Sequence, residues 1–193
     1  MEKLRQHALE RYIPLVRENT GKALQGECEK IMPKNILEIG TAIGYSALLM
    51  LSVCDAKICT LEKDEERLNE AKENFKQFGV ENRVETHLGD AKDFLETFVQ
   101  NQRKFDFIFL DGPKGQYIHY YPLLKKLLPV GGVLFADNVK LLGLVEHTEK
   151  VTHKNRTMTR NMEEFIRTIE KDSDFETNFY DEEDGYCITK KIK

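Results

Sequence analysis

The sequence predicts an α/β fold of the Rossmann-like, doubly wound kind, with a mostly parallel sheet of seven strands that ends in a C-terminal antiparallel hairpin. Short apolar runs alternate with amphipathic stretches of helical length, which is typical of parallel strands joined by covering helices. The length of 193 residues suits one domain and leaves no room for a second core. We therefore expect residues 1–193 to form a single domain that opens with a short helical segment over residues 1–34.

Each expected element follows from a local pattern. Apolar runs that end at or just before a glycine or an acidic residue predict five strands, over 35–40, 57–62, 83–88, 105–110 and 132–136. Amphipathic stretches predict helices over 44–53, 64–78, 91–100, 116–128 and 156–171. Asp64 can cap the second of these helices, and Gly79 ends it. The segments 175–180 and 186–190 flank Asp184-Gly185, which is typical of a hairpin.

Composition excludes several classes of protein. There are 29 Lys and Arg residues against 33 Asp and Glu, and the net charge of −4 argues against holding nucleic acid by bulk charge. No apolar run approaches the roughly 20 residues that a membrane span needs, and the N-terminal residues are charged where a signal peptide is apolar. The four cysteines form no C-x-x-C pair, which favours reduced thiols. We expect a cytoplasmic protein with no membrane partner.

The loop after the first strand is a candidate ligand site. Residues 40–46 read GTAIGYS, which does not match the dinucleotide fingerprint, because that fingerprint needs glycine where this chain has Ala42 and Tyr45. Gly40 still permits a tight turn and a close ligand approach, and the N-terminus of the following helix offers N–H groups to a carboxylate or phosphate. The alternative is that Gly40 and Gly44 are ordinary turn residues.

Acidic residues follow the next two strands. Glu62 ends the second strand, where it could accept hydrogen bonds from a ribose diol, and Asp90 follows the third strand, where an adenine edge could lie. Gly40, Asp111 and Asp137 also lie at predicted strand ends. One edge of the sheet would therefore carry four acidic side chains, those of Glu62, Asp90, Asp111 and Asp137. The plainer alternative for Glu62 is a solvated strand end.

A second candidate site follows the fourth and fifth strands. Asp111, Asp137 and Asn138 offer two carboxylates and an amide oxygen, which suit Mg²⁺, Mn²⁺ or Ca²⁺ and not soft metals. Such a cation could be chelated by an acceptor with two adjacent oxygens and would favour the oxyanion of its hydroxyl. Lys114 is a candidate base, because the ammonium form is disfavoured beside a divalent cation. The alternatives are a loop cap for the Asp-Asn pair and a solvent-exposed lysine.

These segments together resemble the metal-dependent, S-adenosylmethionine (SAM)-dependent class I O-methyltransferases, whose members include catechol and caffeoyl-coenzyme A methyltransferases. The resemblance runs from about Ile13 to the C-terminus and rests on residues 36–46, 61–62, 89–91, 110–117 and 136–138. It implies SAM and a divalent cation, Mg²⁺ first, with Mn²⁺ or Ca²⁺ as alternatives.

The resemblance also implies roles for individual residues. The cofactor-binding candidates are Glu38, Gly40 and Ser46 at the methionine part, Glu62 at the ribose, Asp90 and Ala91 at the adenine, and in addition Thr41, Gly44, Tyr45 and Asp111. The implied metal ligands are Asp111, Asp137 and Asn138, and the catalytic residues are Asp111 and Lys114, with Lys114 as the general base.

Positive charge gathers before and at the start of the helix over 156–171. Lys140, Lys150, Lys154, Arg156 and Arg160 outnumber Glu146 and Glu149 there. Arg156 and Arg160 are four residues apart, so they share a helix face that could bind phosphates, although an ordinary solvated helix start has the same composition.

Residues 40–46, 137–143 and 156–160 resemble the bacterial branch of tRNA 5-hydroxyuridine methyltransferases, which make 5-methoxyuridine at the wobble position. The 5-hydroxyl and 4-carbonyl of that base are vicinal oxygens, and an anticodon loop presents unstacked bases. The resemblance therefore implies a tRNA anticodon loop as partner, with Tyr117 as a weak candidate on the acceptor side, and a homodimer. The N-terminal helical segment of many relatives is expected to be short or absent. The alternatives are a small catechol-like acceptor, or a non-catalytic module that senses SAM or binds RNA.

Overall fold

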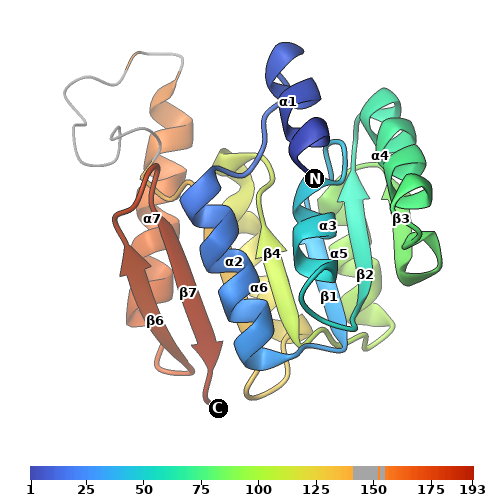
Figure 1. The fold of residues 1–193 in the computed structure, drawn as a ribbon. Coiled ribbons are helices and arrows are strands. Elements are labelled where there is room, and N and C mark those ends of the chain that lie inside the picture. The colour runs from blue at the N-terminus through green and yellow to red at the C-terminus, as the bar shows by residue number, and fades with distance from the viewer. Residues whose placement is uncertain (141–151, 153–154) are drawn as a thin grey trace. The chain divides into compact units, whose positions relative to one another are not determined.

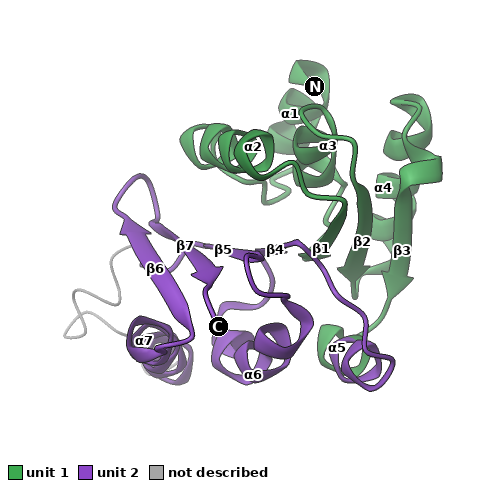
Figure 2. Ribbon diagram, turned by 90° about the horizontal axis from the view of Figure 1, so that it is seen from below, with its two compact units in different colours: residues 1–94 green, residues 95–193 purple. Residues whose placement is uncertain are grey.

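The computed structural model describes residues 1–140, 152 and 155–193 (Figure 1). The chain divides into two compact units, residues 1–94 and 95–193 (Figure 2). In the described part of the chain, no helix is long and apolar enough to cross a membrane. All four cysteines are free thiols, and all four are buried.

The first unit is built around three parallel strands in the order β3-β2-β1. These strands are β1 (Asn35–Ile39), β2 (Lys57–Glu62) and β3 (Val84–Leu88). Its helices are α1 (Glu2–Glu10), α2 (Glu18–Ile31), α3 (Tyr45–Leu51) and α4 (Glu65–Gln77), with a 3₁₀ turn at Glu81–Arg83. Helices α2 and α3 pack against each other (Figure 2), and α4 packs against β2 and β3. Helix α5 (Ala91–Gln100) includes residues of both units.

The expected limits of α4 are confirmed. The side chain of Asp64 accepts a hydrogen bond from the backbone N–H of Arg67 (3.1 Å), so Asp64 caps the helix as its sequence position indicates. At the other end Gly79 adopts a φ of +68°, a left-handed conformation that favours glycine.

The second unit contains four strands in the order β4-β5-β7-β6. They are β4 (Phe107–Leu110), β5 (Val133–Asp137), β7 (Tyr186–Lys191) and β6 (Phe175–Tyr180). Strands β4 and β5 are parallel, whereas β7 is antiparallel to both β5 and β6, which confirms the C-terminal hairpin. Helices α6 (Tyr117–Leu127) and α7 (Arg156–Lys171) pack side by side on one face (Figure 2), where Phe165 makes edge contacts with Tyr117 and Tyr121.

The sequence-based limits hold to within a few residues. The helices expected over 91–100 and 156–171 have those bounds, whereas the helix expected over 44–53 ends at Leu51 and the fourth strand begins at Phe107. Two 3₁₀ turns were not expected, and the N-terminal segment forms two helices. The single-domain expectation stays a prediction.

Candidate active site

In the first unit, the strand register brings the candidate loops to one edge. Ile39 pairs with Leu61, so Gly40 and Glu62 follow at the same end of β1 and β2, and the N–H of Gly40 donates to the carbonyl of Leu61 (3.0 Å). Glu62 is also fastened to the loop after β3, because its carbonyl accepts from the N–H of Gly89 (2.8 Å). The three predicted cofactor segments of this unit therefore lie at one edge of its sheet.

The carboxylate of Glu62 is fixed by three backbone donors. Its Oε2 accepts from the N–H of Ala42 (2.8 Å), and its Oε1 accepts from those of Lys63 (2.9 Å) and Asp64 (3.0 Å). Ala42 has a φ of +45°, a left-handed conformation that is uncommon for a residue with a side chain. No local sequence pattern indicates this contact, which holds the first loop against the end of β2.

Glu38 is the centre of a buried hydrogen-bond network. It has no exposed surface, and its two carboxylate oxygens accept from the hydroxyls of Ser46 and Thr60, both at 2.6 Å. The Thr60 and Thr41 hydroxyls also lie 2.6 Å apart. Such hydrogen bonds to a charged acceptor offset the cost of burying it. Ser46 thus contacts Glu38 directly, and Thr41 is linked to Glu38 through Thr60. The sequence analysis did not single out Thr60, although a threonine amid the apolar residues of β2 was an available signal.

Gly44 lets the first loop approach helix α4. Its φ is +82°, and a Cβ added there would lie 2.5 Å from the ring of Phe75, which is nearly fully buried. The amide of Asn74 also donates to the carbonyl of Ile43 (2.9 Å), so the loop is held from both sides. Tyr45 follows at the start of α3 and is buried.

Asp90 stands at the start of α5. Its Oδ1 accepts from the N–H of Lys92 (2.8 Å), which caps the helix, and its side chain is exposed. Ala91 is buried behind it. The capping bond occupies one carboxylate oxygen of Asp90 and leaves the other available to a ligand.

In the second unit, Asp111 and Asp137 meet at the ends of β4 and β5. Leu110 pairs with Ala136, so the two carboxylates follow at the same edge, and Asp137 is only 3% exposed. Burial, followed by the negative charge of Asp111, raises the pKa of Asp137 to about 7. The N–H of Asn138, a residue with a φ of +55°, donates to Asp137 Oδ1 (2.7 Å). Two adjacent carboxylates, of which Asp137 is nearly fully buried, are a donor set that fits a hard divalent cation.

Lys114 faces this carboxylate pair. It lies in a 3₁₀ turn, Lys114–Gln116, and its Nζ donates to Asp111 Oδ1 (2.5 Å) and to the hydroxyl of Tyr117 (2.9 Å). The Tyr117 hydroxyl lies 2.8 Å from the carbonyl of Leu110 and 3.1 Å from that of Asp137. Tyr117 has no exposed surface, and burial and the neighbouring carboxylates raise its pKa well above the usual value. Tyr117 therefore lies close to the carboxylates, but inside the unit and not at its surface, and its place on the acceptor side stays a prediction.

The predicted basic face is present in part. Arg156 and Arg160 are both exposed on the first turns of α7, and Lys140 forms an ion pair with Asp181 (2.9 Å). Lys150, Lys154 and residues 141–143 of the resemblance lie outside the described residues.

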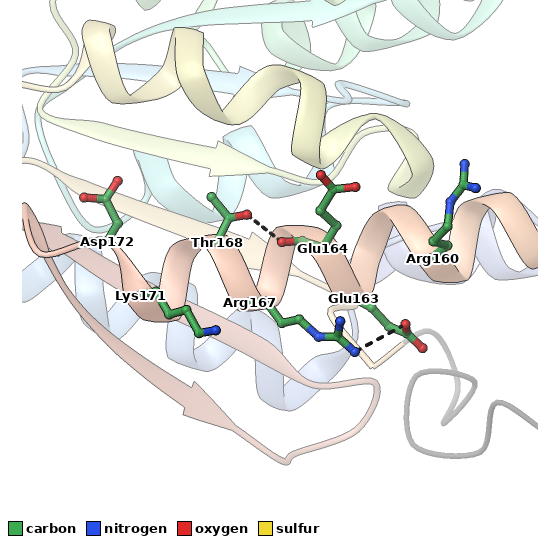
Figure 3. A pocket seen from close by; sticks show the side chains of 7 residues that line it. All are labelled: Arg160, Glu163, Glu164, Arg167, Thr168, Lys171 and Asp172. Carbon is green, nitrogen blue, oxygen red and sulfur yellow. Dashed lines mark hydrogen bonds and ion pairs between the residues drawn. The ribbon is translucent and has the colours of Figure 1, made fainter.

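Further along α7, a surface hollow of about 640 Å³ has a mixed lining (Figure 3). The lining residues are Arg160, Glu163, Glu164, Arg167, Thr168, Lys171 and Asp172. Three acidic and three basic side chains line this hollow, so it carries no excess of positive charge.

The chain resembles known O-methyltransferases in sequence and in fold. A family model described as O-methyltransferase matches residues 1–192. The chain is similar to a candidate caffeoyl-CoA O-methyltransferase from Staphylococcus aureus, with 31% identity, coverage of 98% of this chain and 91% of that one, and a TM-score of 0.90. It is also similar to an O-methyltransferase from Bacillus cereus in complex with SAH, with 26% identity, coverage of 98% and 89%, and a TM-score of 0.88. These likenesses confirm the predicted Rossmann-like α/β fold class.

A curated relative adds a named activity. The catechol O-methyltransferase of Niastella koreensis is 35% identical over 124 residues, which span 63% of this chain and 56% of that protein. The match therefore spans little more than half the length of that relative.

Proposed function

Because this chain belongs to the O-methyltransferase family, whose members use SAM, we propose that it methylates one of two vicinal oxygens of its acceptor with the help of a divalent cation. The observation that carries the cation is the pair of carboxylates at the ends of β4 and β5. Asp137 is almost fully buried beside Asp111, an arrangement that a positive charge stabilises.

The first unit is proposed to bind SAM. Glu62 would accept hydrogen bonds from the ribose hydroxyls, and its three backbone donors support this role because they fix the carboxylate before the ligand arrives. Asp90 and Ala91 would meet the adenine. The first loop would receive the methionine part through Gly40, Thr41, Gly44, Tyr45 and Ser46. Glu38 has no exposed surface, so we assign it a positioning role through Ser46.

The second unit is proposed to activate the acceptor. SAM supplies an electrophilic methyl group, and a cation held by Asp111, Asp137 and Asn138 supplies positive charge that favours the oxyanion of the acceptor hydroxyl. Lys114 Nζ would take the proton from that hydroxyl. Asp111 and Tyr117 support this role because they hold the nitrogen at a fixed position.

Two acceptors have the required vicinal oxygens. A small catechol-like molecule is supported by the catechol and caffeoyl-CoA acceptors that the relatives' names state. The wobble 5-hydroxyuridine of a tRNA anticodon loop is supported by the exposed Arg156 and Arg160, which could contact backbone phosphates. We also propose that the chain forms a homodimer, which light scattering would test. We further propose that it acts in the cytoplasm, because free thiols are typical of that compartment.

The test measures methyl transfer from labelled SAM, with Mg²⁺, to catechol and to tRNA that carries 5-hydroxyuridine. We expect Lys114→Ala to slow turnover at saturating SAM while the Kd for SAM stays unchanged, and the exposed Lys126→Ala control to change neither. Loss of tRNA methylation alone in an Arg156→Ala, Arg160→Ala double variant would assign the RNA acceptor. SAM binding without transfer to either acceptor would instead favour a non-catalytic sensor, and unchanged turnover in Lys114→Ala would remove that residue from the mechanism.

A further inference from the structure

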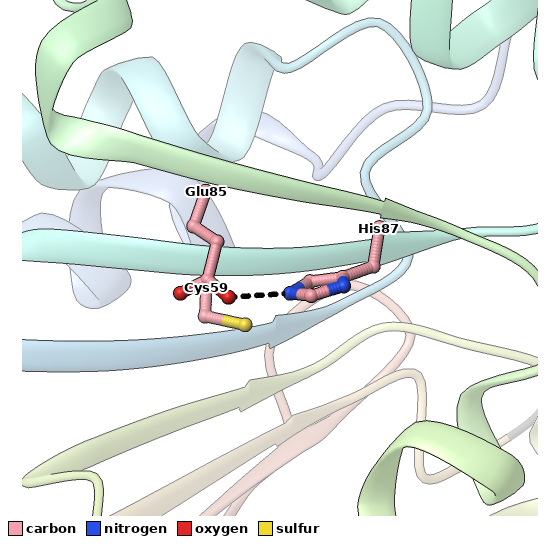
Figure 4. A group of neighbouring side chains, drawn as sticks. All are labelled: Cys59, Glu85 and His87. Carbon is pink, nitrogen blue, oxygen red and sulfur yellow. Dashed lines mark hydrogen bonds and ion pairs between the residues drawn. The ribbon is translucent and has the colours of Figure 1, made fainter.

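A group of three side chains of the types that can bind a metal lies in the first unit, on the sheet itself (Figure 4). It consists of Cys59 on β2 and of Glu85 and His87 on β3. One ligand atom from each side chain, the thiol sulfur, a carboxylate oxygen and a ring nitrogen, lies within 4.8 Å of the other two. None of the three has a part in the proposed methyl transfer.

The strand register brings these residues together. Cys59 pairs directly with Glu85, and Leu61 pairs with His87. Alternate residues of a strand share a face, so all three side chains project from the same side of the sheet. The ring of His87 is oriented further by Glu85, whose Oε1 lies 2.7 Å from Nε2, and by Phe94, whose ring centroid lies 4.8 Å away. The cluster thus rests on paired strands and not on a mobile loop.

We propose that Cys59, Glu85 and His87 bind a divalent transition-metal cation such as Zn²⁺, with water as the fourth ligand. Thiolate, imidazole and carboxylate are the ligands that Zn²⁺ takes in proteins, whereas Mg²⁺ selects oxygen ligands. The site therefore differs in kind from the oxygen donors Asp111 and Asp137.

The charges and distances are compatible with such a site. One thiolate and one carboxylate balance the two positive charges, which suits a cation beside Cys59, a residue only 3% exposed. On binding, the Cys59 thiol forms its bond to the metal and releases its proton to solvent. Bond lengths of about 2.0–2.3 Å place tetrahedral ligand atoms roughly 3.3–3.7 Å apart. Separations near the 4.8 Å limit must therefore narrow by roughly 1 Å, whereas the Glu85 oxygen and the His87 nitrogen, 2.7 Å apart without metal, must separate slightly. Glu85 is exposed and His87 is half-buried, so their side chains have room to make that movement.

Bound metal would fasten β3 to β2. Because the ligands come from two neighbouring strands, a cation that binds only the folded state raises the temperature of unfolding. The segment fastened in this way leads directly into Gly89 and Asp90.

The experiment titrates the purified chain with Zn²⁺ by calorimetry in excess Mg²⁺, and with Co²⁺ by absorption spectroscopy. We expect one Zn²⁺ per chain, a rise in Tm, and a Co²⁺ spectrum with a thiolate charge-transfer band. Cys59→Ser should abolish that band, and Glu85→Gln and His87→Gln should each weaken Zn²⁺ binding by at least about tenfold. Cys187→Ser and His119→Ala, which alter a buried thiol and an exposed imidazole elsewhere, should leave the Kd unchanged.

Two results would overturn the site: a Co²⁺ spectrum without the thiolate band, or a Kd for Zn²⁺ that His87→Gln does not change. If Cys59→Ser fails to fold, His87→Gln decides, because its side chain is half-buried and truncation there leaves no large cavity. The readouts are metal binding and Tm, so failure of this site is distinguishable from failure of the proposed methyl transfer.

Discussion

Replacing Gly44 by alanine should destabilise the protein more than alanine at any exposed turn glycine. Two costs combine at this position. The φ of +82° is left-handed, and the new Cβ would lie 2.5 and 2.7 Å from two atoms of the Phe75 ring. A left-handed alanine costs roughly 1–2 kcal/mol, and overpacking a well-packed core costs roughly 1–3 kcal/mol. The expected loss in free energy of unfolding is therefore about 2–5 kcal/mol.

Two other glycines separate these costs. Gly79 has a φ of +68° with nothing within 4 Å of an added Cβ, so Gly79→Ala should show the backbone cost alone, about 1–2 kcal/mol. Gly26 lies inside α2 with equally open surroundings and no positive φ, so Gly26→Ala should stabilise the protein by about 0.5–1 kcal/mol.

Urea unfolding followed by circular dichroism gives the three free energies. The packing cost is the difference between the losses in free energy of unfolding of Gly44→Ala and Gly79→Ala. The double variant with Gly44→Ala and Phe75→Leu should lose less free energy of unfolding than the two single variants together. A loss in Gly44→Ala no larger than that in Gly79→Ala would refute the reasoning, because Phe75 would then move aside without cost. The Kd for SAM should also rise in Gly44→Ala, since the loop that we propose to hold the cofactor is displaced.

Three further variants test other parts of the fold and the site. Thr60→Val removes one of the two hydroxyl donors to buried Glu38, so urea unfolding should show a loss of roughly 1–3 kcal/mol. Burial raises the pKa of Asp172, but hydrogen bonds, led by that from Lys125, outweigh it and hold the pKa below its usual value. The stabilisation is therefore present above the unfolded pKa and is lost as pH falls through the folded value, so Asp172→Asn should flatten the acid limb of the stability profile. Tyr117→Phe removes a buried hydroxyl that binds the Lys114 ammonium and backbone carbonyls; we expect slower turnover with an unchanged Kd for SAM, and a normal rate would exclude this positioning role.

Local patterns sufficed to predict most of the fold. The helix α4 could be delimited from Asp64 and Gly79, because a capping side chain and a left-handed glycine act within one turn of the chain. The C-terminal hairpin followed from two strand-like runs around a turn for the same reason. The 3₁₀ turn at Lys114–Gln116 was not expected, since it places Lys114 against Asp111 through contacts that no periodicity encodes.

The candidate site was predictable as a set of positions but not as a set of contacts. One partner of Glu38 is Thr60, which pairs with it across β1 and β2, and that register is not fixed by either strand alone. The same holds for Ala42, whose N–H reaches Glu62 through a left-handed φ. Cross-strand geometry therefore decides which polar residues hold the loops and which remain open to a ligand.

The four acidic residues at the strand ends differ in how far contacts within the fold explain their presence. Glu62 accepts three backbone hydrogen bonds, Asp90 caps a helix, and Asp111 pairs with Lys114, so each has a structural reason to be present. The structural reason for Asp137 is weaker, because the hydrogen bond that its carboxylate accepts within the described residues comes from the N–H of the next residue. A carboxylate that is almost fully buried beside a second carboxylate destabilises the fold unless it takes up a proton or positive charge offsets it. Lys114 supplies one such charge through Asp111, and a divalent cation would supply more. Of the four, Asp137 is thus the residue whose position is hardest to explain by folding alone, and it gives the strongest physical argument that this edge binds a metal.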